Sequence, residues 1–108
     1  MKITSADIGG EVVRATDTCI VIDNKTLSSL VLSQTQLQPG AETRGHSHDG
    51  QEEIYFFEAG TGKIQVGEKE IKVHSGDIVL IPAGAFHKVW NTGSFVMVLN
   101  CVFQGTRE

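Results

Sequence analysis

The sequence predicts an all-β fold, a barrel or a double-sheet sandwich, in one domain covering residues 1–108. The chain is 108 residues long, about the length of one domain. It holds 11 Val, 9 Ile and 9 Thr against 6 Ala and 6 Leu, and β-branched side chains fit strands better than helices. No stretch of ten or more residues has helical periodicity. Short alternating or apolar runs recur instead, with turn residues between them.

Ten strands are expected along the chain. From the N-terminus they are Glu11–Ala15, Cys19–Asp23, Ser28–Leu37, Arg44–His48, Glu53–Glu58, Gly62–Val66, Lys69–His74, Ile78–Ile81, His87–Asn91 and Phe95–Phe103. Each later break between them holds the Gly, Pro, Asn, Asp or Ser that tight turns need, at residues 38–40, 49–51, 59–62, 67–68, 75–77, 82–85 and 92–94. Ten short strands must close or stack to hide their edges, which gives the barrel or sandwich.

Composition and charge exclude several classes of function. The net charge of −4, with no cluster of Lys or Arg, disfavours nucleic-acid binding. The longest apolar run, Phe95–Leu99, is far too short to span a membrane, and the first ten residues hold no apolar signal segment. Cys19 and Cys101 are too few for a disulfide scaffold. We expect them to be buried thiols in a reducing cytoplasm, with a single bridge between them left open.

One segment carries the side chains of a metal site. His46 and His48 are two residues apart, and residues i and i+2 of a strand point to the same face. Glu53 follows a glycine-containing turn and opens the next strand. Two imidazoles and one carboxylate on one side of a metal leave positions open for substrate or dioxygen.

A fourth candidate ligand lies further along the chain. The turn Pro82-Ala83-Gly84 delivers His87 to a strand whose alternation puts His87, Val89 and Asn91 on one face.

These segments resemble the two motifs of the cupin superfamily. Every fixed position of both is present: Gly40, His46, His48, Glu53 and Gly60 in the first, and Gly76, Pro82, Gly84, His87 and Asn91 in the second. The resemblance, to a small microbial cupin, implies a double-stranded β-helix (jelly-roll) barrel. It also implies one divalent transition metal per chain, held by His46, His48, Glu53 and His87. Mn, Fe, Co, Ni, Cu and Zn all suit these ligands.

Strand alternation assigns the neighbouring side chains. Tyr55 and Phe57 should line the interior, and Tyr55 is a candidate to touch a ligand. Arg44, with the parity of His46, is a second candidate: it meets an anionic substrate or pairs with Glu42 or Glu52. His74 should be exposed.

An apolar outer surface is also expected, because Ile54, Phe56 and Trp90 should point outward. A homodimer would cover them; the rival is a cover formed by residues 1–15.

The resemblance leaves the function open among three hypotheses, because one fold supports many activities. The first is a metal-dependent enzyme, a dioxygenase or a metal-assisted lyase or isomerase, acting on a small oxygen-rich or carboxylated metabolite. The second is a non-catalytic sensor or carrier that binds a small molecule in the barrel. The third is a sugar- or sugar-phosphate-handling protein.

Overall fold

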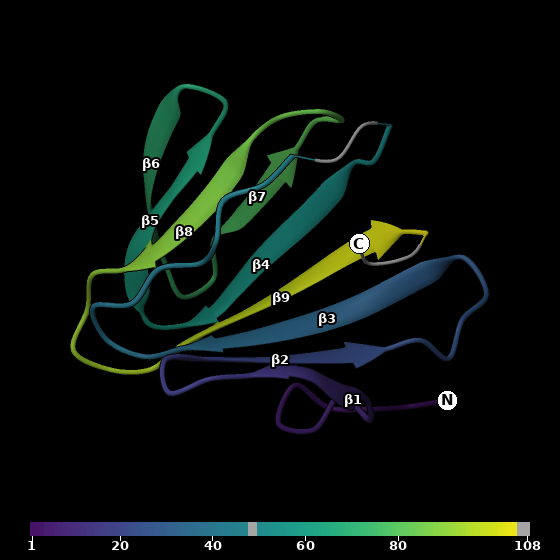
Figure 1. Ribbon diagram of the computed structural model, residues 1–108. Coiled ribbons are helices and arrows are strands. Elements are labelled where there is room, and N and C mark those ends of the chain that lie inside the picture. The colour runs from purple at the N-terminus through teal and green to yellow at the C-terminus, as the bar shows by residue number, and fades with distance from the viewer. Residues whose placement is uncertain (48–49, 106–108) are drawn as a thin grey trace.

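The computed structural model describes residues 1–47 and 50–105, which form nine strands and no helix (Figure 1). The strands are β1 (Glu11–Ala15), β2 (Cys19–Asn24), β3 (Leu30–Leu37), β4 (Glu53–Ala59), β5 (Thr61–Val66), β6 (Lys69–His74), β7 (Ile78–Ile81), β8 (His87–Asn91) and β9 (Met97–Gln104). Within the described part of the chain there is therefore no helix that could cross a bilayer.

Two antiparallel sheets make up the fold. The larger has the strand order β1-β2-β3-β9-β4-β7, and the smaller has the order β6-β5-β8 (Figure 1). β9, the last strand, lies between β3 and β4 in the large sheet, so the C-terminal strand pairs with two strands from earlier in the chain. This arrangement confirms the predicted all-β jelly-roll fold.

Alternation along β4 separates an inner face from an outer face. Glu53, Tyr55 and Phe57 are buried between the sheets, whereas Ile54 and Phe56 are exposed. This confirms the predicted orientation of the strand, and it brings a carboxylate and a phenol into the interior.

The core fills the space between the two sheets. Its members are the buried residues Val31, Leu37, Tyr55, Phe57, Ile64, Val73, Ile81, Val89, Met97, Leu99, Cys101 and Phe103. Burying each large apolar side chain stabilises the fold by about 1.5–3 kcal/mol. No disulfide joins Cys19, which is half-buried, to Cys101, which is buried.

The predicted strand Arg44–His48 is not formed over its described residues. The chain instead runs beside β8 in single bridges, with Thr43 bonded to Val89 and His46 bonded to His87. Three residue steps lead from Thr43 to His46, but only two lead from Val89 to His87 on β8. This segment therefore has one extra residue, and regular pairing cannot continue. His48 lies outside the described residues.

The predicted strand Phe95–Phe103 begins two residues late, at Met97. The fully buried Asn91 explains the delay. Its side-chain amide donates hydrogen bonds to the carbonyl oxygens of Leu37, at 2.8 Å, and Phe95, at 2.9 Å. Its Oδ1 accepts a bond from the amide of Gly93. Asn91 thereby holds residues 92–95 as a loop.

The expected outer patch needs one correction. Ile54 and Phe56 lie on the large sheet, but Trp90 belongs to β8 in the small sheet. The ring of Trp90 is flanked by the ammonium groups of Lys63 and Lys88, 4.7 and 5.3 Å from its centroid. Trp90 therefore does not extend the apolar surface of β4.

Residues 1–8 lie against the large sheet away from β4. The side chain of Asn24 donates to the carbonyl of Ile8, and that of Gln34 donates to the carbonyl of Ser5. Both bonds fix this segment over β2 and β3. Ile54 and Phe56 remain exposed, so the N-terminal residues do not cover them.

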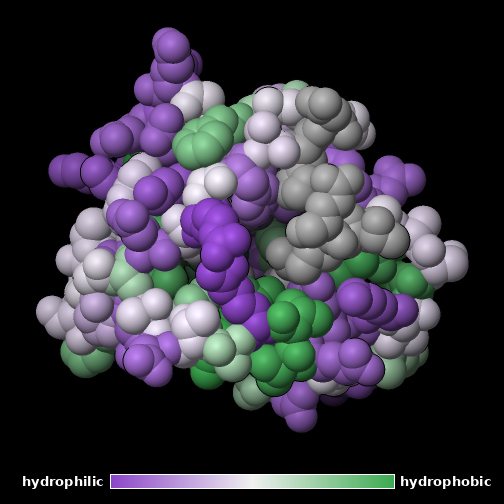
Figure 2. All heavy atoms as spheres, in the orientation of Figure 1, coloured by the Kyte–Doolittle hydropathy of each residue, from purple (hydrophilic) through white to green (hydrophobic). Residues whose placement is uncertain are grey.

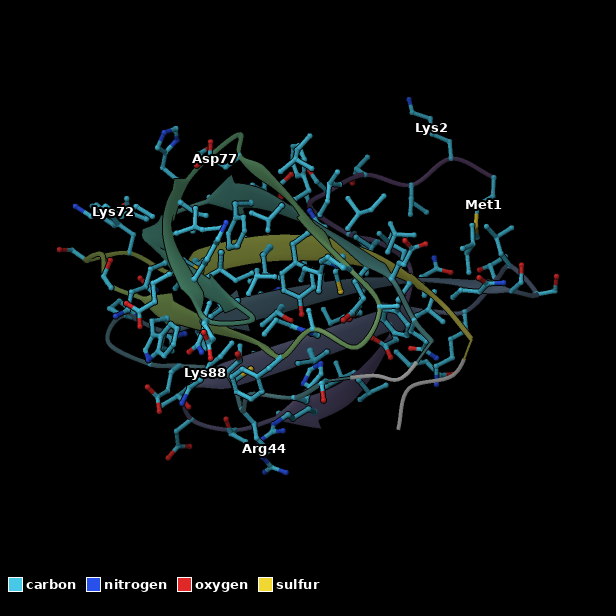
Figure 3. All side chains as sticks on the ribbon, turned by 90° about the horizontal axis from the view of Figure 1, so that it is seen from above. Met1, Lys2, Arg44, Lys72, Asp77 and Lys88 are labelled. Carbon is cyan, nitrogen blue, oxygen red and sulfur yellow. The ribbon has the colours of Figure 1, made fainter. Side chains whose placement is uncertain are left out.

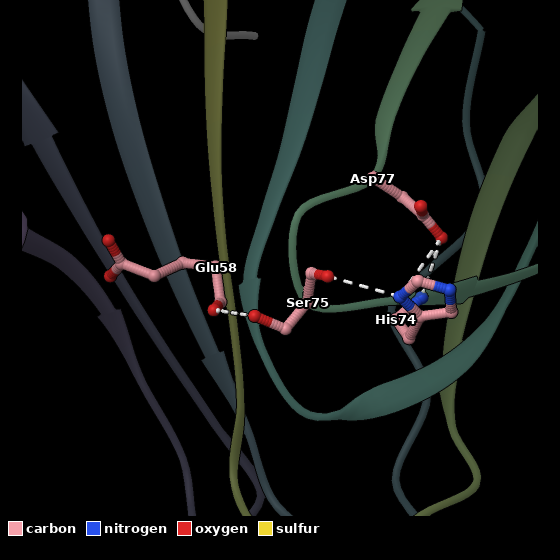
Figure 4. A network of polar contacts seen from close by, with 4 residues as sticks. All are labelled: Glu58, His74, Ser75 and Asp77. Carbon is pink, nitrogen blue, oxygen red and sulfur yellow. Dashed lines mark hydrogen bonds and ion pairs between the residues drawn. The ribbon is translucent and has the colours of Figure 1, made fainter.

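His74 is exposed, as predicted. It ends β6 in a turn where its amide donates to Asp77 and its Nδ1 lies 3.0 Å from the carbonyl of Ser75 (Figure 4). The hydroxyl of Ser75 donates in turn to the carbonyl of Glu58. These bonds close the turn between β6 and β7 and place His74 away from the other histidines that the structure describes.

Candidate metal centre

His46 and His87 are joined by two backbone hydrogen bonds. The amide of His46 donates to the carbonyl of His87 at 3.2 Å, and the amide of His87 donates to the carbonyl of His46 at 2.9 Å. Residues bonded in both directions stand directly opposite each other, so their side chains leave on the same side. The imidazole centroids are accordingly 4.3 Å apart.

Glu53 completes the group from the opposite sheet. As the first residue of β4 it points inward, and its Oε2 lies 2.8 Å from Nε2 of His87. Both side chains are almost fully buried. One nitrogen from each histidine and one carboxylate oxygen of Glu53 lie within 4.8 Å of one another.

A backbone carbonyl sets the orientation of His87. Nδ1 of His87 lies 3.0 Å from the carbonyl oxygen of Ala85, which can only accept, so Nδ1 carries the proton. Nε2 is then the atom that faces Glu53. A histidine whose second nitrogen is held by a carbonyl is the usual arrangement for a metal ligand.

Burial opposes protonation of His87, but its hydrogen bond to Glu53, its hydrogen bond to the Ala85 carbonyl and the charge of Glu53 outweigh it. The pKa of His87 is raised above its usual value. The same buried carboxylate that favours a proton on Nε2 would favour a divalent cation there. A proton and a metal therefore compete for one position.

The donor set fits a transition metal. Metal–ligand bonds of about 2.0–2.2 Å place two ligands of one ion no more than about 4.4 Å apart, and the three donor atoms are already close to that spacing. Neutral imidazole and carboxylate suit divalent transition metals. His48, the fourth predicted ligand, lies outside the described residues, so the structure places three of the four together.

A cavity of about 540 Å³ opens beside this group. His46 and Tyr55 line its inner end, and the ring of Tyr55 meets that of His87 edge-on at 5.5 Å. The molecular face in Figure 2 is hollowed near its centre, with hydrophilic residues in purple beside the hollow. Tyr55 therefore lies in the interior, as predicted, and lines the cavity.

Arg44 lies at the rim of the same cavity. Its side chain is exposed and extends outward from the edge of the molecule (Figure 3). The extra residue between Thr43 and His46 interrupts the regular alternation, but Arg44 and His46 both line the cavity. Neither predicted acidic partner pairs with it among residues 1–47 and 50–105, since Glu42 bonds to Lys88 at 3.0 Å.

Two positions at the site were missed from sequence. A β-carbon at Gly45 would overlap the ring of Phe86, so this ring packs directly on the backbone between Arg44 and His46. Arg14, on β1, also lines the cavity. The Gly45–Phe86 contact could have been suspected from sequence, because each residue is next to a predicted metal ligand. The position of Arg14 depends on a strand irregularity, which leaves no signal in the sequence.

Residues 33–103 match the sequence profile of the family described as "Cupin domain". The chain belongs to the cupin family. An oxalate-binding protein from Thermotoga maritima is 30% identical to this cupin over 64 residues, which are 59% of this chain and 53% of that protein. The match thus spans about half the length of that relative.

Solved structures show the same fold. A predicted oxalate decarboxylase from Thermotoga maritima superposes with a TM-score of 0.77 at 23% identity, covering 98% of this cupin and all of that chain. An RmlC-like cupin from Shewanella frigidimarina superposes with a TM-score of 0.79 at 17% identity, covering 93% and 87% of the two chains. At these identities the likeness concerns the fold alone.

Proposed function

We propose that this cupin is a metal-dependent enzyme acting on a small oxygen-rich or carboxylated metabolite, with one divalent transition metal per chain. The observation that carries the proposal is the convergence of His46, Glu53 and His87 within 4.8 Å, next to the cavity. We assign these residues, with His48, as the ligands. Bound there, a metal would supply a Lewis acid with open positions for substrate or dioxygen.

The chain's own residues would hold and orient the metabolite. Tyr55 lines the cavity next to His87 and is assigned to contact the bound molecule. The sheets bury Glu53 and His87, which keeps water from the inner side of the ligands. Low local polarity strengthens the interactions of charged groups there. No general base beyond these groups is required if the metal itself activates the substrate, which favours a dioxygenase or a metal-assisted lyase or isomerase.

The second candidate is a non-catalytic binding protein, a sensor or carrier. It is favoured by one observation: the relative from Thermotoga maritima is named as an oxalate-binding protein. On this candidate the same metal and cavity would hold a small organic acid without converting it.

Metal analysis followed by a turnover screen tests both candidates. We expect about one divalent ion per purified chain. Oxygen uptake, carbon dioxide release and product formation are then measured with a panel of small organic acids that includes oxalate. Turnover supports the enzyme; tight metal-dependent binding without turnover supports the carrier. Protein that binds neither metal nor any acid would contradict both.

We also propose a homodimer formed through the outer face of β4 and β7. Exposed there are Ile54 (48%), Phe56 (41%), Ile78 (59%) and Leu80 (71%), which pair across the two strands. Monomeric proteins rarely expose an apolar patch beyond a few hundred Å², and β7 leaves one edge open to a further strand. We also propose a cytoplasmic location, on the low cysteine content of the sequence.

A further inference from the structure

A bulge in β1 turns Arg14 toward the cavity. Val12 pairs with Ile22, whose side chain is on the outer face of β2, so regular alternation would place Val13 opposite Val21 and Arg14 opposite Ile20. The register instead shifts between Val12 and Arg14, and Arg14 stands opposite Val21. Val21 is buried and lines the cavity. Re-aiming a side chain is a common effect of a bulge.

Two arginines line the cavity although the chain carries a net charge of −4. Arg14 and Arg44 line it, and neither forms an ion pair within the part of the chain that the structure describes. The acidic residue in its wall, Glu42, is engaged by Lys88 at 3.0 Å, and the hydrogen bond from Lys88 lowers the pKa of Glu42. Arg14 and Arg44 thus line the cavity without an ion-pair partner among the residues that the structure describes.

Cys19 lies in the same wall as Arg14. Burial raises the pKa of its thiol, and the positive charge of Arg14 acts in the opposite direction. Arg14 and the half-buried Cys19 are therefore neighbours in this wall. The hydroxyls of Thr16, Thr18 and Thr35 line the same wall and offer further hydrogen bonds.

We infer that Arg14 binds a second anionic group of the ligand, at the end remote from the metal. The ligand class is a small organic acid that chelates the metal with one end and carries a carboxylate or phosphate at the other. This rests on the proposed function, because the metal supplies the first anchor. The cavity, at about 540 Å³, holds far more than the two carbons and four oxygens of oxalate.

The inference concerns a part of the chain outside the family match. The hairpin of β1 and β2 ends at Asn24, and the match to the cupin domain begins at residue 33. The metal ligands lie inside the match and Arg14 lies outside it. Arg14 is thus a specificity residue of this chain, positioned by its own hairpin.

Matched ligands measure the contribution of Arg14. Malate and lactate carry the same 2-hydroxy acid for the metal, and only malate has a remote carboxylate; 3-phosphoglycerate and glycerate make the same comparison for a remote phosphate. Calorimetry on Mn²⁺-loaded protein should show that the member with the remote anionic group binds about tenfold more tightly in at least one pair, since a charge-assisted hydrogen bond at an exposed arginine gives about this factor. The pair that shows the preference tells carboxylate from phosphate.

Two variants distinguish a specific contact of Arg14 with the ligand from a general effect of the protein's charge. Arg14→Gln should remove the preference and leave lactate and Mn²⁺ affinities unchanged. Lys25→Gln removes an equal charge from an exposed residue that does not line the cavity, and it should keep the preference. Equal affinities within both pairs, or a preference unchanged in Arg14→Gln, would overturn the inference. Wild-type protein that binds neither Mn²⁺ nor lactate would instead overturn the proposed function.

Discussion

His46 and His87 face each other through a reciprocal pair of backbone hydrogen bonds, although 41 positions separate them in the sequence. The backbone, and not a chance meeting of side chains, therefore sets the distance between the two imidazoles. Such preorganisation lowers the entropy that metal binding must overcome.

Removal of either imidazole should abolish tight metal binding. His87→Ala is expected to weaken the affinity for a divalent ion by at least about 100-fold, since loss of even an outer partner of a ligand costs about 10–100-fold. His48→Ala should act similarly, as the sequence motif predicts. Metal content and competition with a chromophoric chelator measure the effect. His74→Ala, at an exposed histidine, is the matched control; equal metal retention in His74→Ala and His87→Ala would refute the ligand assignment.

When the pH is lowered from 8, the metal affinity should start to decrease before pH 6.5 is reached. The metal needs neutral His87, whose pKa in the metal-free protein is raised above the usual value of about 6.5. In that metal-free state, the His87–Glu53 pair contributes stability that is complete below about pH 6.5 and is lost as the pH rises through the raised pKa. Affinity measured between about pH 5.5 and 8 checks the onset. An affinity that stays flat down to pH 6 would contradict it.

A β-carbon at position 45 should disturb the site. Gly45→Ala forces the ring of Phe86 or the backbone beside His46 to move, and overpacking of this kind costs about 1–3 kcal/mol. We expect a lower free energy of unfolding and weaker metal binding, measured by denaturation and by chelator competition. The double variant Gly45→Ala/Phe86→Ala should recover metal affinity, because it removes the obstructing ring. Additive losses in the double variant would show that the ring is not the cause.

Asn91 should matter for stability more than for metal binding. Asn91→Leu leaves the carbonyls of Leu37 and Phe95 without their donor, and each orphaned buried group costs about 1–3 kcal/mol. We expect the free energy of unfolding to fall by about 2–4 kcal/mol in urea titrations. Thr92→Ala, at the exposed neighbour, should change it by less than about 0.5 kcal/mol. Equal effects at both positions would argue against the bonding role of Asn91.

The wild-type protein should be a dimer by light scattering. Leu80→Glu places a charge on the most exposed residue of the β4–β7 surface and should give monomers that still bind metal. Ile71→Glu, at a residue of β6 in the small sheet that is 40% exposed, should remain dimeric. A wild-type protein that stays monomeric across micromolar concentrations would contradict the proposed dimer interface.

Regular strands were predictable from sequence where one face is apolar. The alternation of Tyr55 and Phe57 against Ile54 and Phe56 reads directly as inner and outer faces, and the motif spacing brought Glu53 and His87 together. Prediction failed where the backbone leaves regular geometry. An extra residue after Thr43 interrupts the predicted strand Arg44–His48, and the bulge after Val12 places Arg14 opposite Val21. Such irregularities depend on contacts between distant segments, which local alternation does not encode.

The five residues of β1 are all exposed, and the strand pairs with β2 alone. Arg14 thus stands on a ribbon that the barrel does not need for its core, while Glu53 and His87 stand on strands that it does. In the roles that we propose, ligand choice and metal chemistry would belong to different strands. A hairpin spanning residues 11–24 can be exchanged between related barrels as a unit, so that an engineered chain acquires a new preference for acids and keeps an intact metal centre.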